Sequence, residues 1–137
     1  MVLHASCVAH CGRAVLMTGP SGSGKSGLAL RMIALGARLV ADDRTELCAE
    51  SGGRLLASAP AAIRGLIEAR GVGLLRADPL DRVPLALVVD LAREEPDRLP
   101  PHRQITLLGC TLPLVLRPRN PHLPESLLLW LADGRQA

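Results

Sequence analysis

Gly19-Pro20-Ser21-Gly22-Ser23-Gly24-Lys25-Ser26 is the stretch that decides the fold. It fills every fixed position of the G-x-x-x-x-G-K-[ST] pattern, the phosphate-binding loop or P-loop. The apolar segment Arg13–Thr18 before it predicts a strand. Ser26–Leu35 after it has the apolar spacing of a helix that stops at Gly36. A glycine-rich loop between a strand and a helix is the context in which this motif binds phosphates.

The chemistry of the loop explains its residue types. Lys25 is the only lysine, and every other basic residue is arginine. A compact ammonium can reach between two phosphates where a planar guanidinium does not fit. Successive backbone N–H groups form an anion nest, and the helix adds the positive end of its dipole. Gly22 and Gly24 let the backbone approach the phosphates, and Ser26 offers a hydroxyl to Mg²⁺. Residues 19–26 are therefore predicted to bind the phosphates of a nucleotide and Mg²⁺.

The rest of the chain predicts a strand-rich α/β fold in one domain over residues 1–137. The charged, proline-rich segment Ala92–His102 is expected to be a mobile loop, and Val83–Leu91 a central strand. Helices are predicted at Pro60–Ala69 and Pro124–Gly134. The other predicted strands are Val2–Ala9, Arg38–Ala41, Thr45–Ala49, Arg54–Ser58, Val72–Arg76, and a hairpin of Ile105–Leu108 with Leu112–Leu116.

Composition narrows the function. A net charge of +3 with scattered arginines and 1% aromatic residues does not favour nucleic-acid binding. No apolar run reaches the length of a membrane span, and no signal peptide precedes the first strand, so we expect a cytoplasmic protein. His4, Cys7, His10 and Cys11 lie close in sequence, but strand alternation separates the histidines from the cysteines, which does not favour a zinc site.

Magnesium bound to a P-loop nucleotide needs a further carboxylate at a neighbouring strand end. The sequence offers two candidates: the pair Asp42-Asp43 after Leu39-Val40-Ala41, and Asp90 after Leu85–Val89. Two adjacent aspartates could divide the work, one holding magnesium-bound water and the other accepting a proton. Spacing alone favours the pair only slightly.

A third feature adds a family resemblance. Leu66-Ile67-Glu68-Ala69-Arg70-Gly71-Val72-Gly73-Leu74-Leu75 resembles the E-[apolar]-R-G-[apolar]-G-[apolar] signature of the HPr kinase/phosphorylase family. Arg38–Arg44 is similar to that family's R-L-[apolar]-A-D-D-R segment, and His4 lies where the family has a histidine before its P-loop. The order and spacing of the motifs match from His4 to about Leu75.

The resemblance implies the catalytic domain of that family, with a fold like that of phosphoenolpyruvate carboxykinase and without the family's N-terminal domain. It implies an ATP- and Mg²⁺-dependent kinase that phosphorylates a serine of the phosphocarrier protein HPr, runs phosphorolysis in reverse in many members, and assembles as a hexamer. Transferred to this chain, the resemblance assigns the phosphates to Lys25 and Mg²⁺ to Ser26 and Glu68. It assigns proton transfer to the pair Asp42 and Asp43, with Asp43 preferred. His4 and Arg70 would support the site, and Arg103 would be the catalytic arginine. The signature residues are Glu68, Arg70, Gly71 and Gly73.

Several departures keep other functions open. Pro20 replaces an acidic residue of the family's loop, and Leu114–Asn120 only partly resembles a stretch associated with dephosphorylation. Kinase activity is therefore expected and phosphorylase activity is left open. A small-molecule P-loop kinase and a catalytically reduced nucleotide-binding regulatory module are the alternatives.

Overall fold

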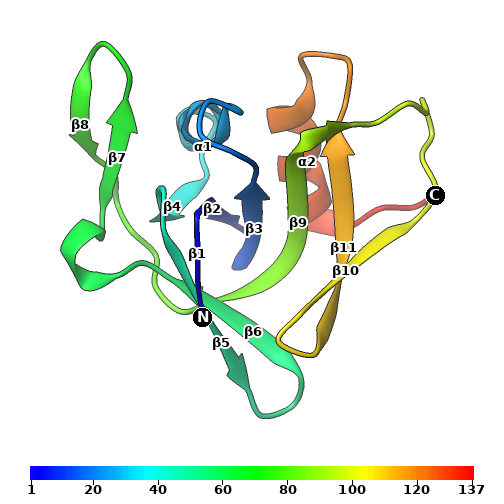
Figure 1. Ribbon diagram of the computed structural model, residues 1–137, viewed down its shortest axis with the longest axis horizontal. Coiled ribbons are helices and arrows are strands. Elements are labelled where there is room, and N and C mark those ends of the chain that lie inside the picture. The colour runs from blue at the N-terminus through cyan, green and yellow to red at the C-terminus, as the bar shows by residue number, and fades with distance from the viewer.

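The computed structural model describes all 137 residues and contains eleven β-strands, two α-helices and one 3₁₀ helix (Figure 1). In chain order these are β1 (Val2–Leu3), β2 (Ala5–His10), β3 (Arg13–Thr18), α1 (Lys25–Ala34), β4 (Arg38–Ala41), β5 (Thr45–Glu50), β6 (Arg54–Ser58), η1 (Ala61–Ile63), β7 (Leu66–Ala69), β8 (Gly73–Arg76), β9 (Val83–Glu94), β10 (Arg103–Leu107), β11 (Cys110–Arg117) and α2 (Leu123–Asp133). The predicted strand-rich α/β class is confirmed.

Strand β9 organises the main sheet. Its first residues pair antiparallel with β6, and the rest of the strand pairs in parallel with β3 on one side and β11 on the other. The main sheet has nine strands. Seven of them follow the order β1-β5-β6-β9-β3-β2-β4, and the other two, β11 and β10, form a branch in which β11 pairs with β9. Strands β7 and β8 form a separate hairpin, which projects from the body beside α1 in Figure 1.

The core lies on both faces of this sheet. Alternate residues of β3 face opposite ways, because side chains alternate along a strand. Val15 and Met17 join a cluster with Met32 of α1 and Leu131 of α2. Leu16 belongs to a second cluster, which includes residues of β5 and β6 where the sheet curls over. The helices therefore cover one face of the sheet, and the sheet itself covers the other.

Most predicted elements are confirmed, and three need correction. The predicted helix Pro60–Ala69 is wrong: after the short η1 the chain turns at Gly65, where φ is 76°, and Leu66–Ala69 forms strand β7. The predicted strand Val2–Ala9 breaks at His4, because β1 pairs with β5 whereas β2 pairs with β3 and β4. Strand β9 extends to Glu94, which shortens the predicted loop.

Neither α-helix combines the length and apolar character that a membrane crossing requires. Their role is to cover the sheet and, in the case of α1, to present its first turn. The loop after β3, the end of β4 and the hairpin β7–β8 all meet near that first turn. This edge of the sheet holds the polar residues described next.

Candidate phosphate-binding site and its acidic pair

The glycine-rich loop joins β3 to α1 in the expected strand–loop–helix arrangement. The Lys25 side chain folds back over the loop, and its ammonium donates to the carbonyl oxygens of Gly19 at 2.6 Å and Pro20 at 3.1 Å. Gly19 has φ of 144°, and a Cβ there would come within 2.6 Å of the Ser23 hydroxyl. Gly24 precedes the helix with φ of 97°. Glycine at these positions therefore follows from backbone conformation and crowding.

Asp42 is the hydrogen-bonding centre of the site. Its Oδ1 accepts from the hydroxyls of Ser26 at 2.6 Å and Ser6 at 2.8 Å, and its Oδ2 accepts from the backbone N–H of Glu68 at 3.1 Å. The residue is only 6% exposed. One carboxylate thus joins β2, β4, α1 and β7 where they meet.

Asp43, the next residue, is in a different environment. Its side chain is 64% exposed, and its backbone has φ of 68°, which is uncommon outside glycine, asparagine and aspartate. His4 Nε2 lies 2.8 Å from Asp43 Oδ1, so the ring N–H donates to the carboxylate. The backbone bends at both aspartates. Asp42 is therefore held inside and Asp43 faces the solvent.

The β7–β8 hairpin completes the site. Glu68 and Arg70 line a cavity of about 280 Å³ together with His4, Lys25 and the aspartate pair. Gly71 has φ of 80° in the turn after β7, and Gly73 has φ of 148° where β8 starts. The segment Glu68–Gly73 therefore supplies two charged side chains, those of Glu68 and Arg70, and the two glycines of the turn that follows them.

Asp90, the alternative carboxylate, does not line this cavity. It pairs in register with Thr18 of β3, but its Oδ1 accepts from the backbone N–H of Ala92 at 2.9 Å and its Oδ2 faces Arg93 at 3.2 Å. Its side chain is therefore engaged by residues of its own strand. The structure thus brings the aspartate pair, and not Asp90, to the first turn of α1.

Arg103 is also placed away from the cavity, contrary to its expected position in a mobile loop. It opens β10, and its guanidinium binds the Glu95 carboxylate through two hydrogen bonds of 2.9 Å. This hydrogen bonding lowers the pKa of Glu95 and raises the pKa of Arg103. Glu95 is 7% exposed, so the pair anchors the start of the 95–102 loop. A catalytic role for Arg103 stays a prediction that this arrangement does not support.

Sequence reasoning missed Ser6. Its hydroxyl is fully buried, donates to Asp42 and accepts from the backbone N–H of Asp43 at 3.3 Å. It therefore fixes both aspartates at once. A serine in the interior of an otherwise apolar strand was the available signal, because a buried hydroxyl requires a partner.

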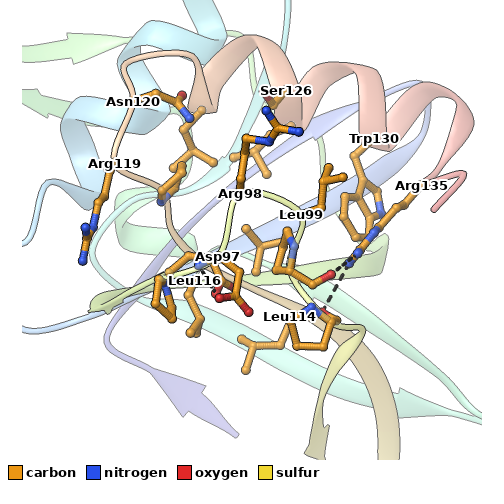
Figure 2. Close-up of a pocket in the computed structure, with 18 of the residues that line it drawn as sticks. Asp97, Arg98, Leu99, Leu114, Leu116, Arg119, Asn120, Ser126, Trp130 and Arg135 are labelled. Carbon is orange, nitrogen blue, oxygen red and sulfur yellow. Dashed lines mark hydrogen bonds between the residues drawn. The ribbon is translucent and has the colours of Figure 1, made fainter.

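A larger cavity, of about 540 Å³, lies elsewhere. Figure 2 shows it between the 95–101 loop and α2, with Leu114 and Leu116 of β11 and Trp130 along its apolar walls. Arg135 closes one end by donating to the carbonyl oxygens of Pro100 and Pro101. None of the predicted site residues lines it. The volume of a cavity therefore does not by itself identify the phosphate-binding site.

The residues near the first turn of α1 suit Mg²⁺. The structure has no cluster of three or more histidine, cysteine, aspartate or glutamate side chains that would bind a metal unaided. Mg²⁺ usually takes one or two protein carboxylates and completes its shell with phosphate oxygens and water. Ser26, Asp42 and Glu68 provide oxygen ligands of this kind beside the loop. The donor set fits a metal that arrives with a nucleotide.

Comparisons with known proteins identify the family to which the chain is similar. The model of the family described as the HPr Serine kinase C-terminal domain matches residues 1–80. The HPr kinase/phosphorylase of Caldicellulosiruptor bescii is 37% identical over 130 residues, which cover 86% of this chain and 42% of that protein. The protein of the same name from Listeria monocytogenes serotype 4a is 38% identical over 103 residues, or 70% of this chain and 33% of that protein. The chain therefore spans less than half the length of these curated relatives.

A solved structure supports the same fold. The Hpr(Ser) kinase/phosphatase from Coxiella burnetii superposes with a TM-score of 0.80 and 25% sequence identity. The match covers 97% of this chain and 89% of that one. The similarity in structure thus extends beyond residue 80, through β9, the β10–β11 hairpin and α2.

Proposed function

Because this chain belongs to the family of the HPr serine kinase C-terminal domain, we propose that it transfers the γ-phosphoryl group of ATP to a serine of an HPr-type phosphocarrier protein. The observation that carries the proposal is the meeting of Lys25, Asp42, Asp43 and Glu68 around one cavity at the start of α1. The identity of the acceptor rests on the names of the relatives.

The two aspartates have separate tasks in this proposal. Asp43 is exposed and has a single side-chain partner, His4, so it is free to accept the proton of the attacking serine hydroxyl. Asp42 already accepts three hydrogen bonds and is buried, so it acts as the group that positions Ser26 and the base. The geometry therefore favours Asp43 as the base, in line with the preference drawn from the family resemblance.

The transfer itself is an in-line displacement. The serine oxygen forms a bond to the γ-phosphorus as the bond to the β–γ bridging oxygen breaks, and the serine proton goes to Asp43. Lys25 and Arg70, both lining the cavity, offset the negative charge on the phosphoryl oxygens. Ser26 and Glu68 would hold Mg²⁺, which neutralises phosphate charge when it is bound.

Transfer of label from γ-labelled ATP tests this proposal. Purified protein with Mg²⁺ and HPr should give labelled HPr, and the label should be resistant to acid as a phosphoserine is. Label that moves to metabolites and not to HPr would identify a small-molecule kinase. ATP binding without any transfer would identify a regulatory module. The relatives' names also include a phosphorylase, and incubation of phosphorylated HPr with inorganic phosphate tests that reaction.

A further inference from the structure

A third cavity, of about 370 Å³, adjoins the cavity of about 280 Å³ that is lined by Asp42, Asp43 and Glu68, here called the acidic cavity. The two share Gly24 and Gly27 as lining residues, so they meet at the first turn of α1. The third cavity continues from there along α1 to the segment between β11 and α2. Its volume lies within the range of roughly 300–1,000 Å³ that small-molecule sites occupy.

The direction of a bound triphosphate follows from the loop. In a P-loop the lysine reaches the β- and γ-phosphates, and the backbone N–H groups hold the α- and β-phosphates. Under the proposed function the γ-phosphate lies in the acidic cavity near Asp43. The α-phosphate then lies near the start of the helix, at Gly27. We propose that the third cavity, here called the nucleoside cavity, holds the ribose and base of ATP; this inference rests on the proposed function.

The polar lining of the nucleoside cavity suits this ligand. Arg31 donates to the carbonyl oxygen of Pro121 at 3.3 Å, and Arg117 Nε donates to that of Leu91 at 3.2 Å. Each guanidinium is positioned by one hydrogen bond and keeps further N–H groups for a ligand. Asn120 Oδ1 accepts from the backbone N–H of His122 at 2.9 Å, which leaves its amide N–H₂ group to donate.

The remaining lining is apolar and carries no negative charge. No aspartate or glutamate lines the nucleoside cavity, whereas two arginines do, so its charge suits a ligand that is joined to phosphates. Its apolar walls are formed by Leu28, Leu91, Pro118, Pro121, Leu123 and Pro124. No aromatic ring is present for stacking. A guanidinium plane can take that role, because arginine stacks on flat π-systems.

Gly27 keeps the connection between the two cavities open. A Cβ at this position would meet no atom within 4 Å, so the space above it is free. The chain of phosphates can therefore pass from the acidic cavity, across the first turn of α1, to the nucleoside cavity. The base would lie against side chains of the 117–124 segment, which the phosphate-binding loop alone would not indicate.

Calorimetric titration with Mg-ATP and with Mg-tripolyphosphate separates the nucleoside from the phosphates. We expect the wild-type protein to bind ATP about tenfold more tightly than tripolyphosphate, because only ATP brings a ribose and a base to the nucleoside cavity. Arg31→Ala and Asn120→Ala should each remove most of that preference and leave the affinity for tripolyphosphate unchanged. Arg31→Lys, which keeps the charge but not the plane, should behave like Arg31→Ala. The control is Arg54→Ala, on the remote β5–β6 hairpin.

The outcomes are distinguishable from those of the kinase proposal. Equal affinity of the wild type for the two ligands, or an ATP preference that survives both substitutions, would overturn the nucleoside cavity while HPr phosphorylation stands. Failure of the wild type to bind either ligand would remove the proposed function and this inference with it. Thermal melting of each variant excludes unfolding as the cause of a lost preference.

Discussion

The Asp42 carboxylate accepts a hydrogen bond of 2.6 Å from the hydroxyl of Ser26, which lies 16 residues earlier in the chain. This contact joins the end of β4 to the first turn of α1. Asp43 is the exposed acid of the pair. In the proposed mechanism, Asp42 is therefore the buried positioning carboxylate and Asp43 the exposed base.

Asp43→Asn should abolish the proton acceptor without disturbing the fold. Asparagine tolerates the left-handed backbone that Asp43 adopts, with φ of 68°, so the turn should be kept. We expect kcat for HPr phosphorylation to fall by about 10²–10⁴-fold, the usual contribution of a general base, with the Kd for Mg-ATP unchanged. Asp133→Asn, at an exposed position at the end of α2, is the matched control. Retention of wild-type kcat by Asp43→Asn would assign the base elsewhere.

Asp42→Asn should have the opposite signature. An amide cannot accept all three hydrogen bonds that the carboxylate accepts, so a donor is left unpaired in a buried position. We expect the free energy of unfolding to decrease by about 1–3 kcal/mol and the affinity for Mg-ATP to weaken. Chemical denaturation and calorimetric titration measure the two effects. An unchanged stability together with a lost kcat would reverse the roles of the two aspartates.

Ser6→Ala tests the residue that connects them. The substitution removes a buried hydroxyl that bonds to Asp42 and to the backbone of Asp43. We expect a loss of about 1–2 kcal/mol of stability and a reduced kcat, since the base is less well positioned. Ser51→Ala, at an exposed turn, should change neither quantity. Wild-type kcat in a less stable Ser6→Ala protein would restrict Ser6 to folding.

Lys25→Arg tests whether the single lysine is required as an ammonium. Lys25 is buried and donates to two loop carbonyls at short distance, a space that a guanidinium fork would overfill. We expect Lys25→Arg and Lys25→Ala to lose Mg-ATP binding to a similar extent. Calorimetry measures it, and the thermal midpoint checks folding. Tight ATP binding by the arginine variant would show that positive charge alone is sufficient.

The Glu95–Arg103 pair should make stability depend on pH in the acid range. Hydrogen bonding to Arg103 lowers the pKa of Glu95 below the ordinary value of 4.5 that it has in the unfolded chain. The pair therefore contributes its full stabilisation above that pH, and the contribution is lost as the pH falls through the folded pKa. We expect Glu95→Gln to be less stable than wild type at pH 7, with a difference that shrinks towards pH 3. Glu46→Gln, at an exposed position, should follow the wild-type curve.

The sequence was a good guide to the local motifs of the site. Residues 19–26 and the pair Asp42-Asp43 each follow a short strand whose apolar residues are buried, so their strand and turn signals agree with the structure. The prediction of a helix at Pro60–Ala69 was wrong because it rested on local propensity: alanine, leucine and arginine favour helices in isolation. Gly65 and the pairing of β7 with β8 override that local preference.

Contacts distant in sequence could not be predicted in the same way. Nothing near Ser6 in the sequence specifies Asp42, 36 residues later, as its partner; the antiparallel pairing of β2 with β4 brings them together. Likewise, the ion pair of Arg103 with Glu95 depends on where β9 ends and β10 begins. The proline-rich segment between them has no hydrophobic periodicity from which these strand ends could be predicted. Resemblance therefore assigns candidate residues to the site, and the structure is needed to distinguish a base from a structural residue among them.

The role of Asp43 as the base is tested most directly by the intact mass of HPr after incubation with Mg-ATP and either wild-type or Asp43→Asn protein, measured when the wild-type reaction has just reached completion. We predict the addition of one phosphoryl group, located on a serine, with the wild type, and HPr that is almost entirely unmodified with Asp43→Asn at equal ATP occupancy. Unmodified HPr in the wild-type reaction, or full phosphorylation by the Asp43→Asn variant, would contradict it.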